Sequence, residues 1–196
     1  MRNRILIGFA ILLGLLASQA SWGQAANSAN DRHPDAISAT DVTNAELQTA
    51  LQKIPSTAVS DQALRVVSIN GEYNVAVGIV RRNKTTGSNP GGAIEHSQVT
   101  EVYHVLKGTG TLVTGGTLEN PKPAAADSEV VKVLVGPSSL GDKVQGGVSR
   151  QIGPGDVVVI PPNTPHWFSE VTSDQIVYLV VRVDPKKLLP AGFKPN

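Results

Sequence analysis

Two short stretches of this sequence carry side chains whose types and spacing are suited to holding a metal ion. The stretch Ile94–Gly108 contains His96 and Glu101, and the stretch Gly155–Glu170 contains His166. Neutral imidazoles and carboxylates are common ligands of iron, manganese, zinc and nickel. Two imidazoles and one carboxylate leave coordination positions open for water, dioxygen or a substrate. The donor set therefore favours a reactive divalent metal site over a sealed structural one.

The same stretches resemble the paired motifs of the cupin superfamily, in particular exported single-domain proteins with a cupin type 2-like barrel. The first cupin motif has the form H-x-H, three or four residues, Glu, six residues, Gly. Glu101 lies seven positions before Gly108, and His96 falls on the second histidine. Ile94 stands at the position of the first histidine. The resemblance therefore implies a first motif that has lost one metal ligand.

The second cupin motif has the form Gly, five residues, Pro, one residue, Gly, two residues, His, three residues, Asn. Gly155, Pro161 and His166 occupy their expected places, whereas Asn163 replaces the inner glycine and Glu170 the final asparagine. Asparagine tolerates a left-handed backbone better than other non-glycine residues, so the turn before the histidine is expected to survive.

The resemblance covers roughly residues 62–184 and implies three metal ligands, His96, Glu101 and His166. Gln98 is a possible additional ligand if the strand bulges there. Residues an odd number of positions apart face opposite sides of a regular strand. We therefore expect an irregularity within Ser97–Thr100, between His96 and Glu101.

Other polar and aromatic residues are candidates for the walls of such a site. Tyr103 shares strand parity with Glu101 and is expected to face the interior, so Tyr103 or Glu170 is predicted to move a proton. Trp167 and Phe168 suit either an aromatic pocket wall or the core. A substrate carboxylate could be bound by any of three arginines, Arg65, Arg81 and Arg150.

The remaining histidines have weaker claims to a functional role. His104 lies an odd number of positions after Glu101, so it is expected on the opposite face, in a structural or subunit-contact role. His33 lies in a polar leader and is expected to be solvated.

The N-terminus has the layout of a secretory signal peptide. Arg2 and Arg4 precede the apolar run Ile5–Ala17, and small residues follow. The run is shorter than the roughly 20 apolar residues that a membrane-spanning helix needs. We expect cleavage after Ala25, or else after Ala20, and hence a periplasmic or secreted protein. An uncleaved membrane anchor is the alternative.

Composition narrows the possible functions further. The absence of cysteine excludes disulfides, thiolate ligands and cysteine nucleophiles. Without Arg2 and Arg4, 15 basic and 16 acidic residues remain, and the basic ones are scattered, so no nucleic-acid or anionic-membrane surface is predicted. The length and 40% apolar composition fit one core.

The sequence predicts an all-β antiparallel jelly-roll barrel preceded by a short helix. Residues 26–61 are expected to form a polar arm and the helix, which begins at a capping box of Thr43 and Glu46 and ends at Pro55, and residues 185–196 a surface tail. The predicted strands are rich in valine and isoleucine and bounded by turn residues: Leu64–Ile69, Tyr73–Arg81, Val102–Leu106, Gly110–Thr114, Val130–Val135, Ser149–Ile152, Val157–Ile160 and Ile176–Val183.

Two segments between or within the motifs support further expectations. Asn120–Asp127 is predicted to be an exposed loop, and Gly136–Gly147 either a flap over the barrel mouth or an inert excursion. Val157–Ile160 is apolar without alternation, which is typical of a strand buried on both faces. We therefore expect that two copies of the chain pair as a homodimer.

Three functions follow from these expectations. The first is a metal-dependent enzyme acting on a small organic molecule, of oxygenase, isomerase or lyase type. The second is a periplasmic module that binds a sugar or an organic acid without catalysis. The third is a scaffold without ligand. Metal content and ligand screening discriminate among them.

Overall fold

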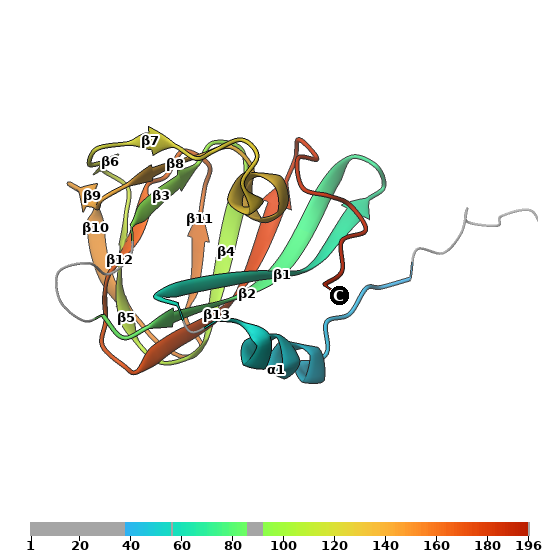
Figure 1. Cartoon of the computed structure of the whole chain (residues 1–196), viewed down its shortest axis with the longest axis horizontal. Coiled ribbons are helices and arrows are strands. Elements are labelled where there is room, and N and C mark those ends of the chain that lie inside the picture. The colour runs from blue at the N-terminus through green and yellow to red at the C-terminus, as the bar shows by residue number, and fades with distance from the viewer. Residues whose placement is uncertain (1–37, 56, 86–91, 196) are drawn as a thin grey trace, which may run out of the picture. The chain divides into compact units, whose positions relative to one another are not determined.

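The computed structural model describes residues 38–55, 57–85 and 92–195, and all described helices and strands lie in one unit, Thr40–Asn196. The expected signal peptide, most of the polar leader and His33 lie outside the described residues. Figure 1 shows two antiparallel sheets that face each other across the core. No described helix combines the length and the apolar character needed to cross a bilayer.

The first sheet has five strands in the order β1-β2-β13-β4-β11. In that order they are β1 (Val59–Ile69), β2 (Tyr73–Asn83), β13 (Gln175–Asp184), β4 (Thr100–Lys107) and β11 (Val157–Ile160).

The second sheet has six strands in the order β10-β5-β12-β3-β8-β7, and one separate pair joins β6 to β9. The six are β10 (Val148–Ile152), β5 (Gly110–Thr114), β12 (His166–Val171), β3 (Ala93–His96), β8 (Ser138–Gly141) and β7 (Lys122–Pro123), and the pair is β6 (Thr117–Leu118) with β9 (Val144–Gln145).

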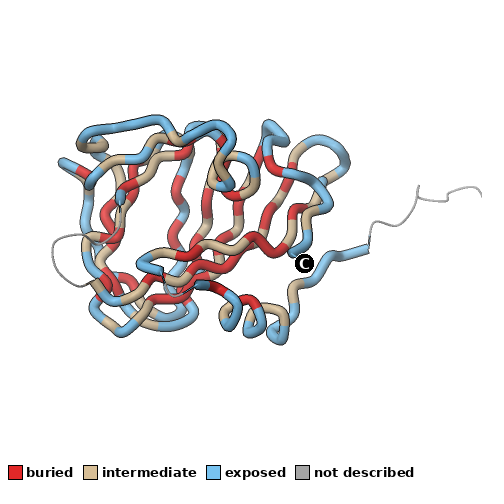
Figure 2. The backbone as a smooth tube through the Cα atoms, in the orientation of Figure 1, coloured by how far each residue is buried: buried red, intermediate tan, exposed pale blue. Residues whose placement is uncertain are grey.

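Alternation along the strands creates the core between the sheets. Tyr103 on β4 is the Cα partner of Val158 on β11 and of Val180 on β13, and all three side chains are buried. Figure 2 shows the buried positions recurring along neighbouring strands. The all-β jelly-roll arrangement confirms the fold class predicted from the sequence.

Helix α1 (Asn44–Lys53) begins as the sequence predicts. The Thr43 side chain accepts a hydrogen bond from Glu46 N–H, and the Glu46 carboxylate accepts one from Thr43 N–H. The helix packs Ala50 against Ile79 and Val177 on the outer face of the five-stranded sheet. One end of that face is therefore covered by the chain itself.

The prediction of a strand at Val130–Val135 is wrong, because these residues form a single π-helical turn, η1. Glu129 caps the start of the turn, the Ser128 carbonyl just before it accepts from Lys132 N–H at 2.9 Å, and Gly136 ends the turn with a φ of 71°. Leu134 packs into a cluster with Ala63. Burial on one side of the turn overrides the strand preference of β-branched residues.

Two other expectations change in the structure. Gly136–Gly147 is not a free flap, since it contributes β8 to the six-stranded sheet and β9 to the separate pair. Asn120–Asp127 is mostly exposed, as predicted, apart from the short pairing of β7 with β8. Val157 and Val159 on β11 are each 61% exposed, so this strand is not buried on both faces within one chain.

Candidate metal centre

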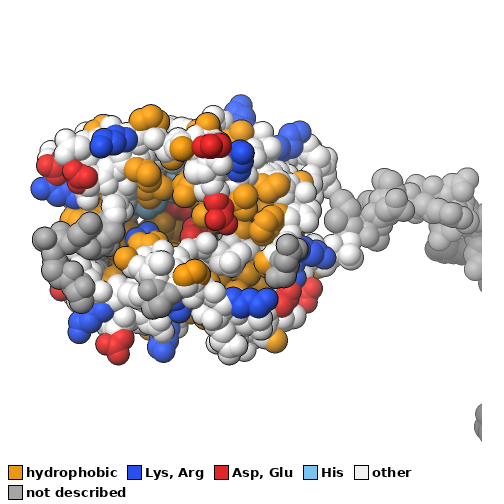
Figure 3. Space-filling model, viewed as in Figure 1, with side chains coloured by type: hydrophobic (Ala, Val, Ile, Leu, Met, Phe, Trp, Pro, Cys, Tyr) orange, Lys and Arg blue, Asp and Glu red, His pale blue; other side chains and the backbone are white. Residues whose placement is uncertain are grey.

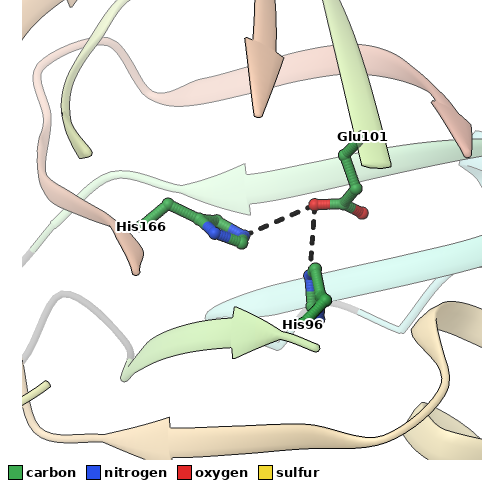
Figure 4. Close-up of side chains that lie close together, drawn as sticks. All are labelled: His96, Glu101 and His166. Carbon is green, nitrogen blue, oxygen red and sulfur yellow. Dashed lines mark hydrogen bonds and ion pairs between the residues drawn. The ribbon is translucent and has the colours of Figure 1, made fainter. Parts of the chain in front are cut away.

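The two sheets together position three candidate ligands. His96 ends β3 and His166 begins β12, which are neighbouring strands of the six-stranded sheet, whereas Glu101 lies on β4 of the opposite sheet. The irregularity predicted between His96 and Glu101 is a passage of the chain from one sheet to the other. The three side chains converge between the sheets (Figure 4).

The turn of the second motif is tied to the first motif. Asn163 has a φ of 58°, the left-handed conformation that the sequence predicts for it. Its N–H donates a 2.7 Å hydrogen bond to the carbonyl of His96. This contact fixes the turn that leads into His166 against the end of β3.

The distances within the cluster suit a single bound ion. His96 Nε2 lies 3.2 Å and His166 Nε2 3.4 Å from Glu101 Oε2, and each of the three side chains is at most 4% exposed. Two ligand atoms that are each about 2.1 Å from an ion lie about 3–3.5 Å apart in tetrahedral or octahedral geometry. The residues present therefore fit a divalent metal.

The hydrogen bonds of His96 show which ring nitrogen carries its proton. Ser138 donates its hydroxyl proton to the carbonyl of Gly136 at 2.9 Å, so Ser138 Oγ is left to accept from His96 Nδ1–H, also at 2.9 Å. Burial lowers the pKa of His96, although Glu101 opposes that shift, and the ring is neutral. The lone pair of Nε2 consequently points at Glu101.

His166 is arranged in the same way. Its Nδ1 lies 3.0 Å from the carbonyl of Thr164, which only accepts, so Nδ1 carries the proton. Its buried Nε2 has no hydrogen-bond partner among the described residues. A ring with its proton on Nδ1 alone presents a second lone pair to the same carboxylate oxygen, 3.4 Å away. Acceptors facing acceptors repel each other unless a cation lies between them.

Neighbouring side chains orient Glu101 and keep it ionised. Tyr103 donates to Oε2 at 2.9 Å, and Arg182 Nε donates to Oε1 at 2.9 Å. Burial raises the pKa of Glu101, but the permanent charge of Arg182 opposes burial and holds this pKa well below the usual range. Burial and the Glu101 carboxylate raise the pKa of Tyr103 well above its usual value, so Tyr103 is a neutral donor.

Sequence reasoning missed Arg182, which is 2% exposed and also pairs with Asp61. The available signal was the position of Arg182 along β13. Arg182 is an even number of residues from Val180 and Tyr178, so all three side chains lie on the inward face of the strand, and the residues between them point outward. Two carboxylates thus neutralise this buried guanidinium.

Several predicted residues do not reach the cluster. Gln98 is half-buried between β3 and β4 and is not among the described residues that line the cavity. Glu170 is exposed on β12 at a register shift opposite Thr111, and it too lies outside the cavity lining. His104 is exposed on the outer face of its strand, as its parity predicts. The ligand and catalytic roles given to these residues stay predictions.

The three arginines first considered for a carboxylate also lie elsewhere. Arg65 pairs with Glu46, Arg81 donates to carbonyls at the end of α1 and just beyond it, and Arg150 is exposed on β10. Of the aromatic pair, Phe168 is buried in the core and stacks on Tyr178, with ring centroids 5.7 Å apart. Trp167 packs in a separate cluster with Val113.

A cavity of about 140 Å³ adjoins the three candidate ligands, and Tyr103 and Tyr178 also line it. Figure 3 shows a hollow in one face of the molecule, with orange hydrophobic side chains around it and the pale blue of a histidine inside. Ile94 lines the cavity at the place of the missing histidine. The apolar wall consists of Val59, Val80, Ile94, Val130, Leu134 and Val135.

Residues 76–192 match the family described as Cupin. The chain belongs to this family.

Solved structures similar to this cupin include a Bacillus halodurans protein, 14% identical, with a TM-score of 0.47 over 79% of this chain and 87% of that one. A cupin-2 domain of Rhodospirillum rubrum is 19% identical, with a TM-score of 0.39 over 69% and 67% of the two chains. A cupin 2 conserved barrel domain protein of Rhodopseudomonas palustris is 18% identical, with a TM-score of 0.39 over 71% and 74%. No curated protein matches the sequence of this cupin.

Proposed function

We propose that this cupin binds one divalent metal ion through His96, Glu101 and His166 and acts with it on a small organic molecule. The observation that carries the proposal is the convergence of two imidazole Nε2 atoms on one carboxylate oxygen, at 3.2 and 3.4 Å, in a buried site. A divalent ion held there supplies Lewis-acid polarisation of a bound oxygen atom or an activated water.

The protein's own groups orient the carboxylate of the site. Arg182 and Tyr103 fix the Glu101 carboxylate so that Oε2 faces the histidines. Of the two residues predicted to move a proton, Tyr103 lines the cavity and Glu170 does not. Tyr103 keeps its proton across the physiological range because its pKa is raised. Tyr103 therefore acts as a neutral hydrogen-bond donor that orients Glu101, and the proton transfer predicted for it stays a prediction.

Metal analysis with matched variants tests this proposal. We expect about one equivalent of metal per chain in the wild type, and less than about a tenth of that in His166→Ala, because two ligands hold an ion far less tightly than three. His104→Ala is the control, since His104 is exposed on the outer face, and it should keep the full metal content. Equal metal content in His166→Ala and the control would contradict the proposal. The element found would also narrow the reaction class.

A binding module without catalysis is the second candidate, and the position of Ile94 favours it. An apolar side chain lines the cavity where the family motif has a histidine, so one donor is missing. Thermal-shift screening against sugars and organic acids, followed by product analysis of each compound that binds, separates the candidates. Ligand recovered unchanged after prolonged incubation with metal-loaded protein would favour the module.

We further propose that the chain is exported and pairs as a homodimer. Export is supported by Arg2, Arg4 and the apolar run Ile5–Ala17. N-terminal sequencing of the protein recovered from a native exporting host should begin at Ala26 or, failing that, at Ser21. Mature protein that still begins at Met1 would contradict export with cleavage. The homodimer is supported by the exposed outer face of β11, where Val157 and Val159 are each 61% exposed.

A further inference from the structure

The cavity beside the candidate metal ligands also contains a second buried arginine, Arg82. The last-but-one residue of β2, Arg82 is 9% exposed and lines the same cavity as His96, Glu101 and His166. Its guanidinium carbon lies 4.8 Å from the centroid of the Phe168 ring. A cation is thus held within reach of any ligand that occupies the cavity.

Arg82 lacks a carboxylate partner, in contrast to the neighbouring arginine. Arg182 pairs with both Glu101 and Asp61, whereas no described carboxylate lies within ion-pair distance of Arg82. The hydrogen bond of Arg82 goes to a neutral group: its Nε donates to the hydroxyl of Tyr178 at 3.0 Å. Burial costs an unpaired ion several kcal/mol, so proteins rarely keep one without a use for its charge.

The free ends of this guanidinium suit one kind of ligand. With Nε engaged by Tyr178, the two Nη groups remain, and the planar fork of arginine matches the paired oxygens of a carboxylate or a phosphate. The cavity of about 140 Å³ is below the range of about 300–1,000 Å³ that is typical of sites for drug-sized molecules. Six of its other lining residues are valine, leucine or isoleucine, and the rest are Tyr103, Tyr178 and Asp61, whose carboxylate pairs with Arg182. The cavity therefore fits a small molecule with one anionic end.

We propose that Arg82 binds the carboxylate of a small monocarboxylic acid, whose remaining atoms lie toward His96, Glu101 and His166. The inference rests on the proposed function, because it names the substrate class of the same site. Arg82 then determines specificity for the anionic end, while the three candidate ligands face the part of the molecule that reacts.

Calorimetric titration with a carboxylate and its neutral amide tests the proposal. The probes are lactate, pyruvate and acetate, each compared with the corresponding amide. We expect the wild type to bind at least one acid at least tenfold more tightly than its amide. Arg82→Met should remove most of that preference, with at least a tenfold loss of acid affinity and less than a twofold change for the amide. Arg150→Met is the control, because Arg150 is exposed on β10, and it should behave as the wild type does.

A second variant keeps the test informative if Arg82→Met fails to fold. Arg82→Lys retains the charge without the planar fork, so it should bind the acid more weakly than the wild type does, with less than a twofold change for the amide. Equal binding of acid and amide by the wild type, or unchanged acid affinity in Arg82→Met, overturns the proposal. Tight binding of inorganic phosphate in place of every acid overturns it as well.

Metal content measured on the same samples separates this inference from the proposed function. If the protein holds its full metal content and the Arg82 variants bind the acid as tightly as the wild type, only the proposed role of Arg82 is overturned. A wild type without metal that still binds the acid through Arg82 overturns metal binding and supports the carboxylate site.

Discussion

At the scale of single residues, the candidate metal centre of this cupin depends on which ring nitrogen of each histidine carries the proton. Ser138 and the carbonyl of Thr164 take the Nδ1 protons of the two histidines. Both Nε2 atoms are then left to face Glu101. Ser138 and the Thr164 carbonyl thus orient the two histidines and determine which nitrogen is available to a metal ion. Other metal sites also orient a histidine through its second nitrogen.

The buried ring of His96 predicts acid sensitivity. Burial lowers the pKa of His96 below 6.5, whereas the unfolded chain binds that proton near pH 6.5, so the free energy of unfolding falls as the pH drops below this value. The lowered pKa of Glu101 acts in the same direction below about pH 4.5. We expect His96 to contribute a slope of up to about 1.4 kcal/mol per pH unit. Urea unfolding of chelator-treated protein between about pH 7.5 and pH 5 measures it.

Two histidine variants serve as the comparison. His96→Gln should show a shallower slope because the titrating ring is gone. His104→Gln should keep the wild-type slope, since its side chain is exposed on the outer face. Identical slopes in all three proteins would show that His96 is not the group responsible.

At the scale of elements, tight turns hold the strands that carry the site. Gly108 ends the first motif between β4 and β5, with a φ of 78°. A Cβ added there would lie 1.9 Å from the carbonyl oxygen of Gln175, at the start of β13. Glycine is therefore required both by the left-handed backbone and by the close approach of a neighbouring strand.

Gly108→Ala should destabilise the protein by more than about 3 kcal/mol, because the backbone must move apart to admit the methyl group. Gly71→Ala is the matched control, since Gly71 has a φ of 72° but no atom within 4 Å of the added Cβ. Its cost should be only the left-handed strain of about 1–2 kcal/mol. Chemical denaturation measures both variants, and equal losses would rule out the steric explanation.

The element that the sequence misidentified also forms part of the cavity. Val130–Val135 reads as a strand because five of its six residues are apolar and four are valine. The structure uses it as the turn η1, with Val130, Leu134 and Val135 on the cavity wall. A short apolar run has no periodicity that separates a helical turn from a strand, so tertiary contacts decide.

At the scale of the whole molecule, the outer face of the five-stranded sheet is left partly uncovered. Helix α1 covers one end, but β11 is an edge strand with Val157 and Val159 each 61% exposed. Edge strands are normally protected by charge, and the outward side chains of β11 have none. A second copy, related by a two-fold axis, would cover the two strands mutually.

Val159→Lys should therefore weaken the homodimer at least tenfold, because each two-fold contact would bury the new charge. Val148→Lys is the control, since Val148 is 62% exposed but lies on β10, the edge of the other sheet. Sedimentation equilibrium measures the association of both variants. A monomeric wild type, or equal weakening in the control, would contradict the assignment of this face.

The sequence alone determined the jelly-roll class, the capped helix and the three residues that converge. The glycines at the turns and the capping box are local signals, which depend on neighbours along the chain and can be read from residue types and spacing. The three candidate ligands were implied by the resemblance of two motifs to the cupin superfamily, and the structure brings them together from β3, β4 and β12.

Only the tertiary structure decided which arginines face the cavity. In β2 both faces of the strand are apolar, because Ile79 packs under α1 while Val80 points into the core. No alternation then tells Arg81 from Arg82, and the sequence analysis considered Arg81, whereas Arg82 lines the cavity. The partners of Arg182, Glu101 and Asp61, lie 81 and 121 positions away along the chain. Contacts at that separation exist only once the sheets have packed, which is why the charges of the cavity could not be assigned beforehand.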